Sequence, residues 1–159
     1  NGISLSASSV DNTGFCMTVV MKINTTDTFR LFESSTTDDF LGEFSYDVDN
    51  SFCDWTNSGS TNSVIIAGSV SYTLGEWAVF SFNIDSGTVT MYSFINGANS
   101  SSKGITTNVF RNLDRILVGG NIDVAEFTLY NNPRLVNTQN PGVDLTSEVS
   151  RLMTKYNIS

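Results

Sequence analysis

Residues 75–97 read GEWAVFSFNIDSGTVTMYSFING, and this stretch decides the fold of the chain. Its first half alternates with the two-residue period of a pleated strand: Ala78, Phe80, Phe82 and Ile84 on one face, and Trp77, Val79, Ser81 and Asn83 on the other. Gly87 offers a left-handed conformation for a chain reversal, and residues 88–95 are rich in β-branched and aromatic types. Asn96-Gly97 is a second hairpin signal. Large apolar groups on both faces predict that this hairpin lies inside a two-sheet stack.

Similar patterns extend in both directions from this hairpin. Strands are predicted at residues 3–7, 15–23, 28–33, 40–48, 64–67, 69–72, 116–120 and 123–130, with residues 109–113 leading into the strand at 116–120. The polar segments 49–63 and 97–107 are predicted to be long loops. One helix is predicted at residues 146–156, with Val149, Leu152 and Met153 as its apolar stripe. Many short strands with one late helix predict an all-β sandwich. The predicted core comprises Phe80, Phe82, Ile84, Val89, Met91, Ile116, Val118, Val124, Phe127 and Leu129.

The central hairpin also resembles a known family. A tryptophan after a Gly-x pair, a strand, a glycine turn, a strand with Tyr92 and then Asn96-Gly97 is similar to the central hairpin of laminin-G-like domains. These domains belong to the concanavalin A-like lectin/glucanase superfamily, and residues 116–120 and 122–131 resemble its last strands. The resemblance implies one antiparallel, two-sheet jelly-roll sandwich over residues 1–159, with one short C-terminal helix and with Trp77 in the core. The spacing from Tyr92 to Asn96 is longer than in the family.

Charge excludes several classes of partner. The net charge is −8, charged residues make up 15% of the chain, and histidine is absent. Binding to nucleic acid or to anionic lipid needs clustered lysine and arginine, so both are excluded. No apolar run is long enough to insert in a membrane. A surface dominated by Ser, Thr and Asn predicts a secreted protein, extracellular or at a particle surface.

The same residues argue against catalysis. Without histidine, a histidine-assisted serine or cysteine nucleophile and a histidine-built zinc site are excluded. The Glu-x-Asp-x-x-Glu string of the glucanase relatives is absent. Asp123 and Glu126 stand three residues apart on one strand, so their carboxyls are predicted to point to opposite faces. The chain is therefore predicted to be no enzyme, with a divergent glycan hydrolase or lyase as the third-ranked function.

Two cysteines, Cys16 and Cys53, leave two interpretations open. Each lies in an apolar, strand-like context, so two buried thiols are possible. An oxidising compartment favours a Cys16–Cys53 disulfide.

Calcium is the predicted cofactor, because it takes carboxylate, amide and carbonyl oxygens. Similar domains often hold calcium at the sandwich rim, and Asp11 with Asp123 is the favoured pair. Acidic loops without metal are the alternative interpretation.

A glycan site is predicted around Trp55, because an aromatic ring in a polar loop suits sugar stacking. Asp54 and Asn57 flank it, and Asn99 in the second polar loop is a further candidate. The alternative is that Trp55 plugs one end of the sandwich. The main hypothesis is a lectin-like or adhesin-like module for glycan or surface-protein ligands. The second is a self-associating structural subunit of a fibre, appendage, or viral or phage surface.

Overall fold

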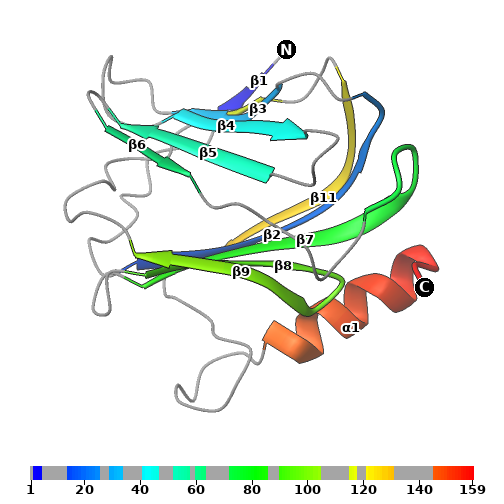
Figure 1. The fold of residues 1–159 in the computed structure, drawn as a ribbon. Helices are drawn as coiled ribbons and strands as arrows, with labels where there is room; N and C mark the ends of the chain where they lie inside the picture. Colours follow the sequence, from blue (N-terminus) through cyan, green and yellow to red (C-terminus); the bar gives the residue numbers. More distant parts are fainter. Residues whose placement is uncertain are drawn as a thin grey trace.

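The computed structural model describes residues 2–4, 14–25, 29–33, 41–46, 52–57, 60–63, 72–85, 90–104, 115–117, 121–130 and 145–159. Its described strands form two antiparallel sheets that lie one above the other, and a helix covers the far side of the second sheet (Figure 1). The predicted all-β sandwich with one C-terminal helix is confirmed.

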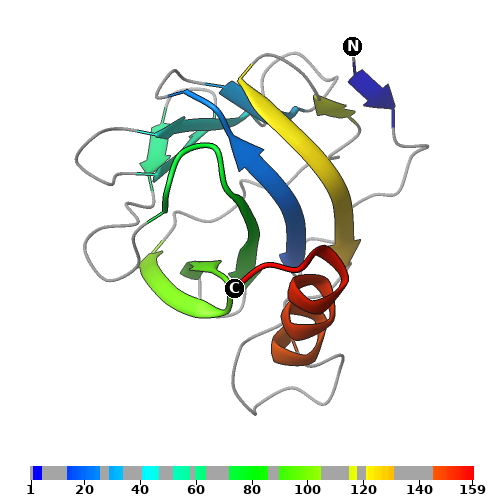
Figure 2. The ribbon, with the colours of Figure 1, turned by 90° about the vertical axis from the view of Figure 1, so that its right-hand side faces the viewer.

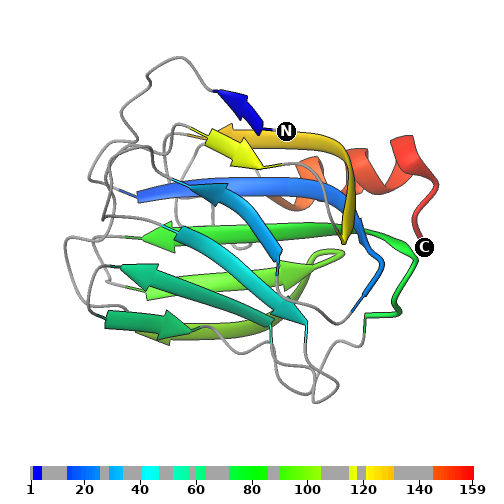
Figure 3. The same ribbon diagram turned by 90° about the horizontal axis from the view of Figure 1, so that it is seen from above.

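One sheet has six strands in the order β1-β10-β3-β4-β5-β6, and the other has five in the order β11-β2-β7-β8-β9. Seen from above, the strands of the six-stranded sheet cross over those of the five-stranded sheet (Figure 3). The elements are β1 (Gly2–Ser4), β2 (Gly14–Ile23), β3 (Phe29–Glu33), β4 (Leu41–Tyr46), β5 (Phe52–Asn57), β6 (Ser60–Ser63), β7 (Trp77–Asp85), β8 (Thr90–Ile95), β9 (Ala98–Gly104), β10 (Arg115–Leu117), β11 (Ile122–Tyr130) and α1 (Leu145–Tyr156).

The central strands β2 and β7 are buried on both faces, because one face meets the other sheet and the opposite face meets α1. Side chains alternate along a strand, so every second residue faces α1 and the residues between them face the other sheet. Cys16, Val20 and Val79 belong to the cluster packed under α1. The side chains of opposite parity, Met17, Val19, Met21 and Phe80, are fully buried toward the six-stranded sheet. Among the predicted core residues, Phe80 is buried, Val124, Phe127 and Leu129 are half-buried, and the other side chains lie outside the described part.

Helix α1 buries a stripe at i, i+4 and i+7: Leu145, Val149 and Leu152. Its end has a defined geometry. Asn157 adopts a left-handed φ of 52°, and the Ile158 N–H donates to the Met153 carbonyl at 2.9 Å. This closing turn sends the C-terminal residues back across the five-stranded sheet toward β7 (Figure 2). Within the described residues, no helix has the length and hydropathy of a membrane span.

The turn between β8 and β9 follows the sequence signal. Asn96 and Gly97 both have positive φ, 50° and 82°, as a two-residue type I′ hairpin requires. The hairpin predicted at Asn96-Gly97 is confirmed.

Two predicted loops are wrong. Segment 49–63 contains β5 and β6, and segment 97–107 contains β9. Their Asp, Asn and Gly residues are of types depleted in strands, but each strand pairs with a neighbour, and β6 and β9 end their sheets. Cross-strand pairing therefore outweighs local propensity here. The strand predicted at 64–67, residues 69–71 of the strand predicted at 69–72, and the segment 109–113 lie outside the described residues.

The two cysteines lie on different sheets. Cys16 on β2 is buried in the cluster packed under α1, and Cys53 lies on β5 of the six-stranded sheet. The Cys53 side chain lies outside the described part, so the Cys16–Cys53 disulfide, which requires close Cα atoms, stays a prediction.

Candidate functional site

A row of three polar and aromatic side chains crosses the outer face of the five-stranded sheet, beyond the end of α1. Asp123 on β11 pairs in register with Lys22 on β2, and Lys22 with Trp77 on β7. The Lys22 ammonium lies 2.7 Å from Asp123 Oδ2 and 5.3 Å from the centre of the Trp77 ring. Asn24 Nδ2 donates to the same Asp123 oxygen at 3.2 Å. We call Asp123, Lys22 and Trp77 the Trp77 row.

The prediction that Trp77 lies in the core is wrong, since 38% of the residue is exposed. Its parity places it on the outer face with Val79 and Ser81. Val79 is covered by residues of α1, but the helix ends at Tyr156. The next pair on this face, Lys22 and Trp77, therefore stays partly exposed. The ring is instead braced on one side by Lys22, as a cation–π contact.

Glu126 also lies on the outer face, contrary to the prediction for Asp123 and Glu126. The register of β11 against β2 shifts between Val124 and Glu126, so that Asp123 pairs with Lys22 and Glu126 with Val20. A bulge inserts one residue, and this returns Glu126 to the face of Asp123.

Bringing the two carboxyls to one face does not make a hydrolytic pair. Glu126 accepts from Lys155 Nζ at 2.6 Å, from Arg151 Nη2 at 2.9 Å and from the Tyr156 hydroxyl at 2.9 Å. These contacts, with Lys155 first, lower the Glu126 pKa to about 2, and the Lys22 contact lowers the Asp123 pKa. A general acid in a glycosidase needs a raised pKa, so neither carboxyl fits that role.

The Glu126 contacts join a wider network that ties α1 to the sheet. Arg151 also donates to both oxygens of Glu148, at 2.8 Å each. Glu148 in turn hydrogen-bonds Tyr130 on β11, and burial raises the Tyr130 pKa to about 12. This network fixes the helix end that borders the Trp77 row.

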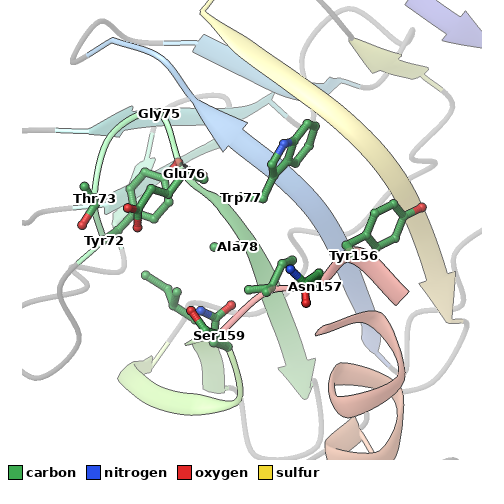
Figure 4. A pocket seen from close by; sticks show the side chains of 12 residues that line it. Tyr72, Thr73, Gly75, Glu76, Trp77, Ala78, Tyr156, Asn157 and Ser159 are labelled. Atoms are coloured by element: carbon green, nitrogen blue, oxygen red, sulfur yellow. Dashed lines mark hydrogen bonds between the residues drawn. The ribbon is translucent and has the colours of Figure 1, made fainter. Parts of the chain in front are cut away.

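Next to Trp77 lies a pocket of about 440 Å³. Its walls come from three segments: residues 72–73 with 75–78, the turn at 95–96, and residues 156–159. Figure 4 shows Tyr72 and Glu76 of the turn at the upper left and Asn157 and Ser159 below them. Trp77 lies between Glu76 and Tyr156. The volume falls within the range of small-ligand sites, roughly 300–1,000 Å³.

The pocket opens where β7 extends beyond β8. The Val79 N–H donates to Asn96 Oδ1 at 2.9 Å, and the Val79 carbonyl accepts from the Asn96 N–H at 2.9 Å. Both backbone groups of Val79 therefore point away from β2. Because the pointing direction repeats every second residue, the backbone N–H and carbonyl of Trp77 point to the same side, which is the pocket side.

The turn that forms one pocket wall is held rigidly against the end of β2. The Tyr72 hydroxyl donates to the Glu76 carbonyl at 2.6 Å and accepts from the Ile23 N–H at 2.8 Å. The Gly75 N–H donates to the Ile23 carbonyl at 2.8 Å, and Gly75 has a φ of 82°. The Tyr72 ring meets Phe80 edge-on at 5.3 Å. This wall needs little ordering when a ligand binds.

The residues predicted for glycan binding lie elsewhere. Asp54, Trp55 and Asn57 are on β5 of the six-stranded sheet, and Asn99 is on β9, opposite Phe94. Their side chains lie outside the described part, so the Trp55 hypothesis stays a prediction. The sequence did carry a signal for Trp77, because it shares the strand face of Ser81 and Asn83, but the reach of α1 could not be read from it.

The calcium hypothesis also stays a prediction. Asp11 lies outside the described residues. Asp123 is already contacted by the Lys22 ammonium, which a calcium ion at that carboxylate would have to displace. Within the described segments, no group of three or more Asp, Glu, Cys or His side chains is placed to hold a metal.

No family model and no curated protein sequence matches this chain. Among solved structures, a heptameric SAP-like pentraxin from Limulus polyphemus is similar, with a TM-score of 0.61 at 12% identity over 87% of this chain and 68% of the pentraxin. The binding domain of botulinum neurotoxin DC, in complex with SialylT, has a TM-score of 0.63 at 12% identity. The match covers 89% of this chain but 36% of the toxin chain. A galectin from Caenorhabditis elegans, LEC-6, has a TM-score of 0.54 at 16% identity over 81% of this chain and 89% of the galectin. These similarities show the fold alone, an antiparallel jelly-roll β-sandwich.

Proposed function

We propose that this chain is a non-enzymatic, extracellular binding module that holds a saccharide against Trp77. The observation that carries the proposal is the exposed Trp77 ring beside a preformed pocket with polar walls. An aromatic ring offers a flat apolar surface to the C–H face of a sugar, while backbone and side-chain polar groups bond its hydroxyls. The galectin and toxin-domain likenesses support this choice of ligand class. A laminin-G-like relationship is part of the proposal.

The test is a glycan array followed by titration calorimetry on the best hit, with Trp77→Ala as the variant. We expect at least a 30-fold loss of affinity, as for a central aromatic contact of about 2 kcal/mol. Leu74→Ala is the matched control, because Leu74 is also 38% exposed and lies in the adjacent turn. It should bind as the wild type does.

Fluorescence separates Trp77 from Trp55, since the chain has two tryptophans. In a Trp55→Phe variant all emission comes from Trp77, and saccharide should shift it. If Trp55→Phe alone loses binding while Trp77→Ala keeps it, the proposal is wrong and the site lies on β5.

Affinity per site should be weak, because an open surface buries little ligand area. Several copies would then provide avidity. The pentraxin likeness, a heptamer, supports testing this by light scattering and by comparing monomeric with clustered protein on the same array.

A further inference from the structure

The cation of the Trp77 row is already neutralised. Lys22 Nζ lies 2.7 Å from Asp123 Oδ2, and Asn24 holds the same carboxylate oxygen in place. An anionic group on a ligand would therefore have to compete with Asp123 for Lys22 while staying close to the Asp123 carboxylate. Asp123 is 51% exposed in its side chain, so its negative charge faces the approaching ligand.

Two further cations among the described residues near the site are neutralised in the same way. Arg151 is bound to Glu148 and Glu126, and Lys155 lies 2.6 Å from Glu126. Glu76 adds an exposed carboxylate on the pocket wall. The field at the site is thus slightly negative, and the whole chain carries −8. Such a field repels anions before contact.

An uncharged saccharide meets no such cost. It can stack on the Trp77 ring without breaking the Lys22–Asp123 pair. Its hydroxyls can donate to the exposed Asp123 carboxylate, which is a strong acceptor. The Trp77 backbone groups on the pocket side supply a further donor and acceptor.

We infer that the Trp77 row selects uncharged saccharides over sialylated, uronic or sulfated ones, and that Asp123 sets this selectivity by neutralising Lys22. The inference rests on the proposed function and names its ligand class. Binding of the uncharged ligand should change less than twofold between low and high salt, because no net charge is neutralised.

The experiment compares each uncharged array hit with its sialylated or sulfated form, on wild type, Asp123→Asn and Asp123→Asn/Lys22→Gln. Asp123→Asn keeps the size of the side chain and its contact with Asn24, but it releases the Lys22 charge. We expect it to gain at least fivefold in affinity for the anionic form, with a salt dependence that the wild type lacks. The double variant should lose that gain. Glu76→Gln is the matched control, because it removes a nearby carboxylate that does not pair with Lys22, and it should change the preference far less.

The outcomes separate the two proposals. A wild type that prefers anionic forms, and loses them on Lys22→Gln, overturns the selectivity and leaves Trp77 as the platform. An Asp123→Asn variant with unchanged preference also overturns it. Circular dichroism checks that each variant folds, and the salt series on the wild type tests the inference without any variant. Failure to bind any array glycan would overturn the proposed function and the selectivity together.

Discussion

The outer face of the five-stranded sheet has two regions that differ although the same strands build them. Under α1, Cys16, Val20 and Val79 are fully buried in an apolar cluster. Two residues further along the same strands, Lys22 and Trp77 are partly exposed and carry polar or aromatic contacts. The boundary follows the last turn of the helix and not any change in the strands. A short helix therefore decides which part of a continuous sheet face is core and which part can meet a ligand.

The largest expected difference between the regions is in stability. Leu152→Ala should lower the free energy of unfolding by roughly 2–5 kcal/mol, because the Leu152 side chain of α1 is fully buried against the sheet and its loss leaves a cavity there. Urea unfolding measures this. Ser150→Ala on the exposed side of the same helix is the control and should cost far less.

A second change under α1 should act in the opposite direction. Thr18 and Ser81 face each other across β2 and β7, and both hydroxyl oxygens are buried with no hydrogen-bond partner. A buried unsatisfied hydroxyl costs about 1–3 kcal/mol, so Thr18→Val should stabilise the fold by up to that amount. A loss of stability in urea would show that a water or a partner satisfies Thr18.

Acid should weaken the contacts of Glu126 that hold the end of α1 on the sheet. The folded pKa of Glu126 is about 2, against an ordinary value of 4.5, so its contribution is present above about pH 4.5 and is lost as pH falls toward 2. We expect hydrogen exchange in α1 to rise over this range, by a smaller effect than the core substitution, because exposed ion pairs are screened. Glu126→Gln should remove most of the pH dependence. An equal rise in the variant would assign it to another carboxyl.

The smallest stability effect is expected at Trp77. Trp77→Ala should lower the free energy of unfolding by about 1 kcal/mol, the order of the lost Lys22 cation–π contact at a partly exposed position, while it removes glycan binding. A cost of several kcal/mol would show that the ring acts as core and would remove the contrast between the two regions.

Local pattern was enough for the elements whose residues and neighbours agree. The alternation in residues 15–23 and 77–84 predicted β2 and β7, Asn96-Gly97 predicted the type I′ turn, and the stripe through Val149 and Leu152 predicted α1. Strand and helix periods and the left-handed turn are properties of short sequences, so no knowledge of distant contacts is needed.

Tertiary structure decided the rest. β5, β6 and β9 are strands because partners supply their hydrogen bonds, although their segments lack the regular apolar alternation of a strand. The register shift before Glu126 depends on pairing with β2, and it alone brings Asp123 and Glu126 to one face. Cys16 is buried and Trp77 is exposed because α1, sixty or more residues away in sequence, covers one and stops before the other. The sequence by itself determined which segments are strands and helix by their period of alternation. The site depends on where α1 ends over β2 and β7, which only the tertiary structure decides.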